Sequence, residues 1–189
     1  MKAFPWDPVL PILSRDKAES EKALAQTNRM NQRLKKRPPK ARAIAIVTEE
    51  GLWKSEAQAH RLVRAAAALA LGPAPKRGVT ILLTDDVRLA ALNARFRGVN
   101  RATNVLSFPS DAPDYLGDIA IAYGVVAAEA RAQGKSFAAH AAHLAAHGVL
   151  HLLGYDHERA SAADIMEAFE RRILKRLGLA DPYQRRKAA

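Results

Sequence analysis

The chain has 189 residues, of which 49% are apolar, and it carries a formal net charge of +11 without any cysteine. This length suits one domain with an appendage, the lack of cysteine excludes a disulfide framework, and no apolar run approaches the roughly 18 residues that a membrane span needs. The positive charge favours a polyanionic partner, and we expect a cytoplasmic protein.

The first segment, residues 1–41, is predicted to be a basic extension that is mobile or loosely docked. Residues 1–42 hold eleven Lys or Arg against four Asp or Glu, so +7 of the net charge lies there. A polar helix could form within 16–36, but its apolar positions are sparse and the stretch RLKKRPPKAR ends it. The short apolar run near its start is too proline-broken for a signal peptide. The extension either contacts the polyanion or is a solubilising tail.

Strand and helix patterns follow the extension. Strands are predicted at 43–47, 79–83, 104–108 and 117–123, and helices at 53–71, 87–96, 125–133, from Ser136 to Gly154, and at 160–177. Thr84 is the expected N-cap of the second helix, with Asp85 and Asp86 in its first turn. Arg97 ends this helix, and its position alone favours a role in complementing the helix dipole.

The order of these elements predicts an α+β fold, in which a small mixed four-stranded sheet is packed with about five to six helices. The domain is expected to span residues 42–183, and residues 184–189 form a basic C-terminal tail. The last helix should pack one face on the core, because apolar residues recur there at spacings of four: Ile165, Phe169, Ile173 and Leu177. The strand order does not follow from the sequence.

Five of the six histidines lie in the run HAAHLAAHGVLHLLGYDH, residues 140–157. His147 and His151 are four apart on a predicted helix, so their imidazoles project from one face about one turn apart. Gly154 is expected to end the helix, which lets the chain turn and bring His157 toward the other two. The HxxxHxxGxxH pattern therefore predicts a metal site with these three histidines as ligands.

The remaining histidines of this run receive other roles. His143 and His151 are separated by about 12 Å of helical rise, so His143, His147 and His151 cannot all bind the same ion. We assign His143 to packing or to support of the site, and His140 to the start of the helix near Ser136, the expected N-cap. The alternative for His147 and His151, a pair of hydrogen-bonded core residues, does not account for the glycine turn and the third histidine.

The residue types favour one zinc ion with an open coordination position. Structural zinc sites are closed, have four ligands and usually contain cysteine, which this chain lacks. Three protein ligands leave the fourth position for a water, which such a site makes acidic near neutral pH. The pattern is therefore typical of a hydrolase.

The run HGVLHLLGYDH, residues 147–157, closely resembles the signature of the YbeY family of bacterial metal-dependent endoribonucleases, which act in ribosomal RNA maturation. Two further stretches agree in order and spacing: LNARFRGVNRATNVLSFP at 92–109 and LGDIAIA at 116–122. The triplet Asp181-Pro182-Tyr183 also resembles the family's tail. The resemblance covers about residues 43–183.

The resemblance implies a zinc-dependent endoribonuclease that acts on single-stranded RNA, especially rRNA precursors, and so in ribosome biogenesis. Its partners would be RNA and the ribosomal subunit, with neither a membrane nor DNA expected. It implies that His147, His151 and His157 bind zinc, and that Arg97 is the essential arginine of the substrate cleft. A guanidinium there would bind the scissile phosphate bidentately and stabilise the developing charge. Ser107 is expected to line the cleft, and Asp118 to support the site.

Two other functions stay open. One is a non-catalytic RNA-binding ribosome-assembly factor with a structural zinc. The other is a metzincin-like peptidase, which shares the ligand spacing but places a glutamate general base directly after the first histidine, where this chain has Gly148. For a nuclease, the sequence names no general base and does not choose between attack by water and attack by a 2′-hydroxyl.

Overall fold

The computed structural model describes residues 44–49, 51–72, 77–157 and 159–184. The predicted basic extension, and the C-terminal tail apart from Gln184, lie outside these residues. Their assignments therefore stay predictions.

Four strands form one mixed sheet, as the order of elements predicted. They are β1 (Ile44–Thr48), β2 (Gly78–Thr84), β3 (Val105–Pro109) and β4 (Tyr115–Ala122). The order across the sheet is β1-β2-β4-β3, in which β1, β2 and β4 run parallel and β3 pairs antiparallel with β4. Every residue of β2 is buried, which agrees with its almost continuous apolar sequence and its central place in the sheet.

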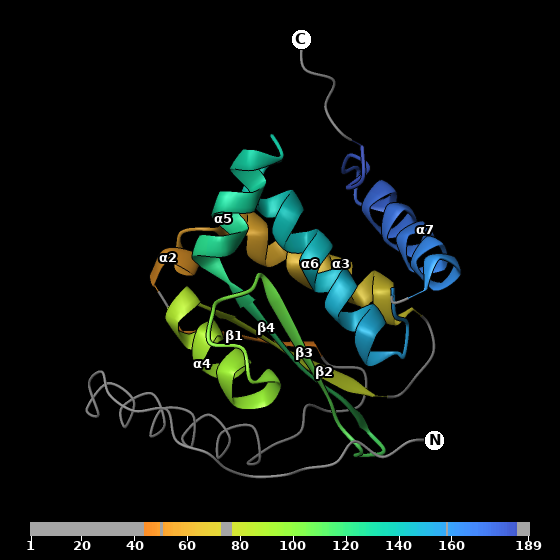
Figure 1. Ribbon diagram of the computed structural model, residues 1–189. Helices are drawn as coiled ribbons and strands as arrows, with labels where there is room; N and C mark the ends of the chain where they lie inside the picture. Colours follow the sequence, from red (N-terminus) through yellow and green to blue (C-terminus); the bar gives the residue numbers. More distant parts are fainter. Residues whose placement is uncertain (1–43, 50, 73–76, 158, 185–189) are drawn as a thin grey trace, which may run out of the picture. The chain divides into compact units, whose positions relative to one another are not determined.

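Helices cover both faces of the sheet (Figure 1). The helices of the described residues are α2 (Gly51–Lys54), α3 (Ala57–Leu71), α4 (Asp86–Arg97), α5 (Tyr123–Ala132), α6 (Phe137–Leu152) and α7 (Ala160–Arg176). Helices α3, α5 and α6 lie over one face and α4 over the other, while α7 lies beside α6. None of these helices is long and apolar enough to cross a membrane. The α+β prediction is confirmed.

Helix α6 lies close to its neighbours because many of its buried residues are small. Alanines of α3 and α6 are buried where the two helices meet, which leaves room for their backbones to approach: Ala59, Ala66, Ala67, Ala141, Ala142, Ala145 and Ala146. On the sheet side, a Cβ added at Gly148 would come within 2.9 Å of Cγ2 of Ile119 and 3.2 Å of Oγ of Ser107. The C-terminal half of α6, which carries two of the predicted ligands, is thus held firmly against β3 and β4.

Two details at the start of the domain differ from the prediction. The helix predicted at 53–71 is divided into α2 and α3, because Trp53 is fully buried and its indole N–H donates to the carbonyl of Thr84 at 2.9 Å. Thr84 belongs to β2, and the N-cap of α4 is Asp85, whose carboxylate accepts a hydrogen bond from the amide of Arg88 at 2.7 Å.

The buried face of α7 also differs from the predicted stripe. Ile165 is 54% exposed, whereas Met166, Glu170, Ile173 and Leu174 are buried. The apolar spacing predicted that Ile165 and Phe169 face the core, but the buried positions there are Met166 and Glu170, one residue later. The prediction failed because a glutamate occupies a buried position in the middle of the helix. This residue contacts the predicted metal site.

Candidate metal centre

The structure brings His147, His151 and His157 together. One nitrogen from each ring lies within 4.8 Å of the corresponding atoms of the other two. His147 and His151 project from the last turns of α6, and His157 comes from the turn that follows. Gly154 has φ +91°, and the amide of Tyr155 donates to the carbonyl of Leu150 at 3.0 Å, so the chain reverses there as the sequence predicted.

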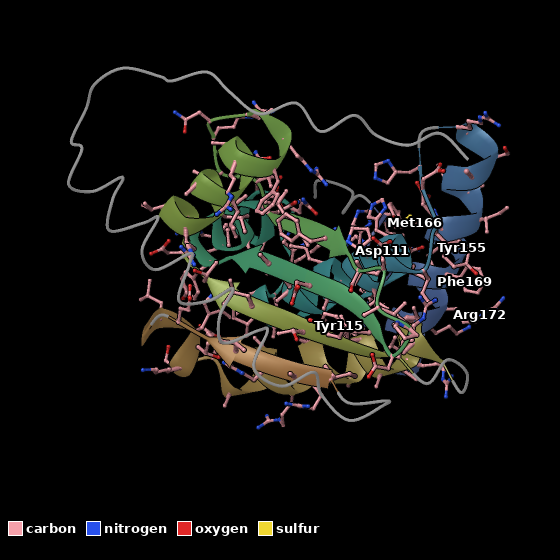
Figure 2. The ribbon with its side chains drawn as sticks, turned by 90° about the horizontal axis from the view of Figure 1, so that it is seen from below. Asp111, Tyr115, Tyr155, Met166, Phe169 and Arg172 are labelled. Atoms are coloured by element: carbon pink, nitrogen blue, oxygen red, sulfur yellow. The ribbon has the colours of Figure 1, made fainter. Side chains whose placement is uncertain are left out.

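Tyr155 fixes this turn from two sides. Its ring packs against the ring of Phe169 on α7, with centroids 5.1 Å apart, and Figure 2 shows the two side chains next to each other. Its carbonyl accepts a hydrogen bond from Nδ1 of His151 at 3.0 Å. The same residue therefore anchors the turn to α7 and orients one of the three imidazoles.

Hydrogen bonds determine which nitrogens of His147 and His151 carry lone pairs. Nδ1 of His151 faces a backbone carbonyl, and Nδ1 of His147 lies 2.8 Å from Oε1 of Glu170. Both partners are acceptors, so each Nδ1 carries a proton, and in the neutral form of either ring Nε2 presents a lone pair. Burial, followed by the charges of His147 and His157, lowers the pKa of His151 to about 4, so this ring is neutral near pH 7.

The two Nε2 atoms of His147 and His151 face each other, 2.9 Å apart. No proton of the neutral tautomers lies between them, so a cation is the group that would satisfy both. Tetrahedral zinc with bonds of about 2.0–2.1 Å needs its ligand nitrogens roughly 3.3 Å apart, a few tenths of an ångström more. To hold a single metal ion, the His147 and His151 nitrogens would move slightly apart, and the nitrogens of the group, which lie within 4.8 Å of one another, would adjust to this spacing.

Glu170 is the carboxylate that orients His147, and it is fully buried. Its Oε2 also accepts from Nε2 of His143 at 2.8 Å and from the hydroxyl of Tyr183. Burial would raise the pKa of Glu170, but the hydrogen bonds from His143 and His147 outweigh it and lower the pKa to about 2. Burial and this contact with Glu170 raise the pKa of Tyr183. An ionised carboxylate thus lies directly behind the metal site.

His140 and His143 lie along the same helix but outside the group of three. Nε2 of His143 is bound to Glu170, in keeping with the supporting role assigned to it, and Nε2 of His140 lies 2.7 Å from Oε2 of Glu129. His140 is only 3% exposed, and its burial lowers its pKa although Glu129 opposes this shift. His140 is therefore a buried, hydrogen-bonded residue and not merely part of the helix start.

Two cavities adjoin each other near His140, whose Nε2 contacts Glu129. The first has a volume of about 560 Å³ and is lined by His147 and His157 together with residues of α5, α7 and the segment after α7. The second has a volume of about 420 Å³ and is lined by Arg97 and Arg101. Both are lined by Asn104 and Glu129, whose side chains are joined by a hydrogen bond of 3.0 Å from Nδ2 of Asn104.

Arg97 lies at the exposed end of α4, in the second of these cavities. It does not line the cavity of His147 and His157, which adjoins it across Asn104 and Glu129. No hydrogen bond or ion pair joins its guanidinium to another described residue. Arg97 therefore lies in the cavity that adjoins the one lined by His147 and His157, and the N–H groups of its guanidinium could donate to a ligand there.

Ser107 and Asp118 lie on opposite faces of the sheet. Oγ of Ser107 donates to the carbonyl of Gly148 at 3.2 Å, and Ser107 lines neither of the two cavities. Asp118 pairs across the strands with Phe108, on the face toward α4, where it accepts from the hydroxyl of Tyr115. The expectation that Asp118 supports the metal site is wrong, since side chains alternate along a strand and Ile119 takes the face toward α6.

Three residues of the site were not identified from the sequence: Glu129, Glu170 and Tyr183. Glu129 and Glu170 are separated from their histidine partners by 11 and by 23 or 27 positions. The available signal for Glu170 was a single acid among apolar residues on one face of α7. The signal for Tyr183 was its place in the triplet that resembles the family's tail.

The family described as "Endoribonuclease YbeY" matches residues 47–178. A protein named "Endoribonuclease YbeY" from Rhodopseudomonas palustris (strain HaA2) is 47% identical over 158 residues, which cover 75% of this chain and 81% of that protein. Another of the same name, from Maricaulis maris (strain MCS10), is 47% identical over 146 residues, which cover 75% of this chain and 91% of that protein.

A solved structure also matches. It is the solution structure of a Thermotoga maritima protein, with 25% identity and a TM-score of 0.49, covering 76% of this chain and 100% of that chain. The family match begins after the predicted basic extension and contains all three clustered histidines and Arg97.

Proposed function

The chain belongs to the YbeY family of endoribonucleases, and from this premise we propose that it is a metal-dependent endoribonuclease that cleaves phosphodiester bonds of single-stranded RNA. Support comes from the names of its relatives, from the convergence of three imidazoles, and from the net charge of +11, which suits an RNA partner. The observation that carries the metal requirement is the pair of facing Nε2 atoms of His147 and His151.

The finer parts of the proposal concern the ion and the biological substrate. We propose one zinc ion, because three imidazole ligands suit zinc and the ligand set leaves a position open. We further propose that the RNA is a precursor of ribosomal RNA, so that the protein meets the ribosomal subunit and acts in ribosome biogenesis in the cytoplasm.

The residues of the site have separate tasks in this proposal. When bound, the ion supplies Lewis acidity beside the scissile phosphate and lowers the pKa of a water. His147, His151 and His157 would hold it. The carboxylate of Glu170 and the carbonyl of Tyr155 keep the Nδ1 protons of His147 and His151 in place, so that the Nε2 lone pairs remain directed at the site.

Arg97 is proposed to bind the RNA phosphate from the adjoining cavity. Its planar guanidinium can donate two parallel hydrogen bonds to phosphate oxygens and oppose the charge that develops as phosphorus becomes five-coordinate. Arg101 lines the same cavity and adds positive charge for the neighbouring backbone. Asn104 lies between the two cavities, where an RNA strand that joins Arg97 to the metal would pass.

The packing of Gly148 argues against the peptidase alternative. A peptidase of the metzincin type would carry its glutamate at this position, but the position faces the sheet, where even a Cβ would lie 2.9 Å from Ile119. A longer side chain does not fit there. The proposed reaction therefore needs no carboxylate from position 148.

The experiment for this proposal is an RNA cleavage assay with the full-length protein. Zinc-loaded protein is incubated with matched single-stranded and double-stranded RNA, alone, with a chelator, and in parallel with the His151→Ala variant. We expect cleavage of the single strand only, lost both with chelator and in the variant. Cleavage that survives in both controls would mean that the activity belongs to a contaminant, and a lack of cleavage by loaded protein would refute the proposal.

A further inference from the structure

Glu170 is a charged residue in an unusual position. It is 0% exposed, on a helix whose other buried residues are Met166, Ile173 and Leu174. Removing a carboxylate from water is costly unless donors surround it, and a hydrophobic residue of similar size would often serve stability equally well. Helix packing alone therefore does not account for this residue.

The three donors of Glu170 are divided between its two oxygens. Oε2 accepts from His143 and from Tyr183, whereas Oε1 accepts from Nδ1 of His147 at 2.8 Å. Among the described residues, His147 is thus the hydrogen-bond partner of Oε1. Oε2 already has two donors, so Oε1 is available to act on His147.

Tyr183 contacts Glu170 because the residues before it, Asp181 and Pro182, are held by contacts with α7 and with Lys135. The carbonyl of Pro182 accepts from Nζ of Lys135 at 2.5 Å, and Oδ2 of Asp181 lies 3.4 Å from Nε of Arg171. The guanidinium of Arg171 also lies over the ring of Tyr183, 4.8 Å from its centroid. The hydroxyl of Tyr183 therefore approaches Glu170 from a segment that is itself held in place.

We propose that Glu170, held by His143 and Tyr183, is a positioning residue that fixes the tautomer and the orientation of His147 for metal binding. This inference rests on the metal site proposed above. Because Oε1 accepts a hydrogen bond from Nδ1–H of His147, the proton of the neutral ring stays on Nδ1 and Nε2 faces His151 before any ion arrives. The segment after α7 thus takes part in metal binding through Tyr183, although none of its residues is among the three proposed ligands.

The test compares Glu170→Gln and Tyr183→Phe with the control Glu167→Gln in the full-length protein. Glu167 lies one turn earlier on α7, lines the same cavity and pairs with the exposed Arg171. Zinc affinity is measured by competition with a chromophoric chelator. The tautomer of His147 in metal-free protein is read from its ring ¹⁵N shifts.

A glutamine can accept from one histidine through its carbonyl, but its amide group would meet the N–H of the other. We expect Glu170→Gln to weaken zinc binding by about 10- to 100-fold and to move His147 toward the Nε2–H tautomer. Tyr183→Phe should weaken zinc binding by about 2- to 10-fold, and Glu167→Gln should leave affinity and tautomer unchanged.

The outcomes separate this inference from the proposed function. Wild-type protein that binds no zinc would refute the metal site itself. Tight wild-type binding with unchanged affinity and unchanged His147 tautomer in Glu170→Gln would overturn the positioning role alone. Should Glu170→Gln fail to fold, Tyr183→Phe decides, because Tyr183 is 38% exposed and loses only a hydroxyl; wild-type affinity and tautomer in that variant would then overturn the inference.

Discussion

Arg97 and the three histidines illustrate how single residues divide the proposed chemistry. The histidines present lone pairs to a cation, and Arg97 presents donors to an anion from the neighbouring cavity. An arginine in the last turn of a helix can also simply complement the helix dipole. A variant that keeps the positive charge but replaces the planar guanidinium distinguishes phosphate binding from complementing the helix dipole.

Arg97→Lys is that variant. Lysine keeps the positive charge but loses the planar fork, so we expect RNA cleavage to fall by about 10- to 100-fold, the value of a charged hydrogen bond, while zinc content stays normal. Arg95→Lys, also exposed in the last turn of α4, is the matched control and should cleave at nearly the wild-type rate. Wild-type turnover in Arg97→Lys, measured under the same conditions, would return Arg97 to the dipole role.

Asp118 provides a pH prediction away from the metal site. Burial raises its pKa above the ordinary value of 3.8, opposed by the hydrogen bond from Tyr115. A raised pKa means that folding favours the protonated form, so the stability from Asp118 is complete below pH 3.8 and is lost as the pH rises through the raised value.

Asp118→Asn should remove the decrease in stability that accompanies ionisation of Asp118, because asparagine does not ionise. We expect the free energy of unfolding of the variant to exceed that of wild type by a larger margin at pH 7 than at pH 3.5. Urea denaturation at both pH values measures this difference. A margin that is constant with pH, or that shrinks toward pH 7, would show that the folded protein does not disfavour the Asp118 carboxylate.

The sequence predicted which histidines lie together, because that signal is local. His147, His151 and His157 fall within eleven positions, and a helix followed by a glycine turn suffices to bring them together. Glu170 could not be found in this way, because its contact with His147 depends on how α7 packs against α6. Asp118 was misassigned for a related reason, since its face of β4 is known only once the strand is placed in the sheet.

At the level of elements, the site depends on how closely α6 approaches the sheet. Every strand and helix was predicted to within a few residues, apart from the division of α2 from α3, because hydrophobic periodicity is a local property. The order β1-β2-β4-β3 was not predicted, because it depends on pairing between distant segments. In that order β3 and β4 lie beside the C-terminal half of α6, where Gly148 contacts them.

Gly148→Ala tests whether α6 packs closely against the sheet at this position. The added methyl would lie 2.9 Å from buried Ile119, which is expected to cost about 1–3 kcal/mol, more than the helix propensity gained. Gly51→Ala is the control, because no atom lies within 4 Å of a Cβ at that helical position. We expect the first variant to unfold at lower urea concentration than wild type, and the second not to. Equal stability of all three proteins would mean that α6 is not tightly packed at Gly148.

At the level of the whole molecule, the charge and the proposed active site lie in different parts of the sequence. Residues 1–42 contain +7 of the +11 net charge, whereas the family match begins at residue 47. Deleting residues 1–39 should therefore leave folding and zinc binding intact and weaken RNA binding. For single strands, the slope of log affinity against log salt is roughly −0.7 per phosphate contact, so the slope should also flatten.

Binding isotherms at three or more salt concentrations check this prediction. Circular dichroism and zinc affinity of the truncated protein are the controls for folding. An unchanged slope would show that the extension does not touch RNA and is better described as a solubilising tail or a docking segment. A truncated protein that cannot fold would show instead that the extension contributes to the core.

In the proposed function, one ion held by three histidines is required for RNA cleavage, and a metal titration examines this requirement. Metal-free protein receives zinc in substoichiometric steps, and cleavage of a single-stranded RNA is measured after each addition, with His157→Ala in parallel. We expect no cleavage without metal, a linear rise that ends at about one equivalent, and no rise in the variant. Full cleavage by metal-free protein, or an equal rise in His157→Ala, would contradict it.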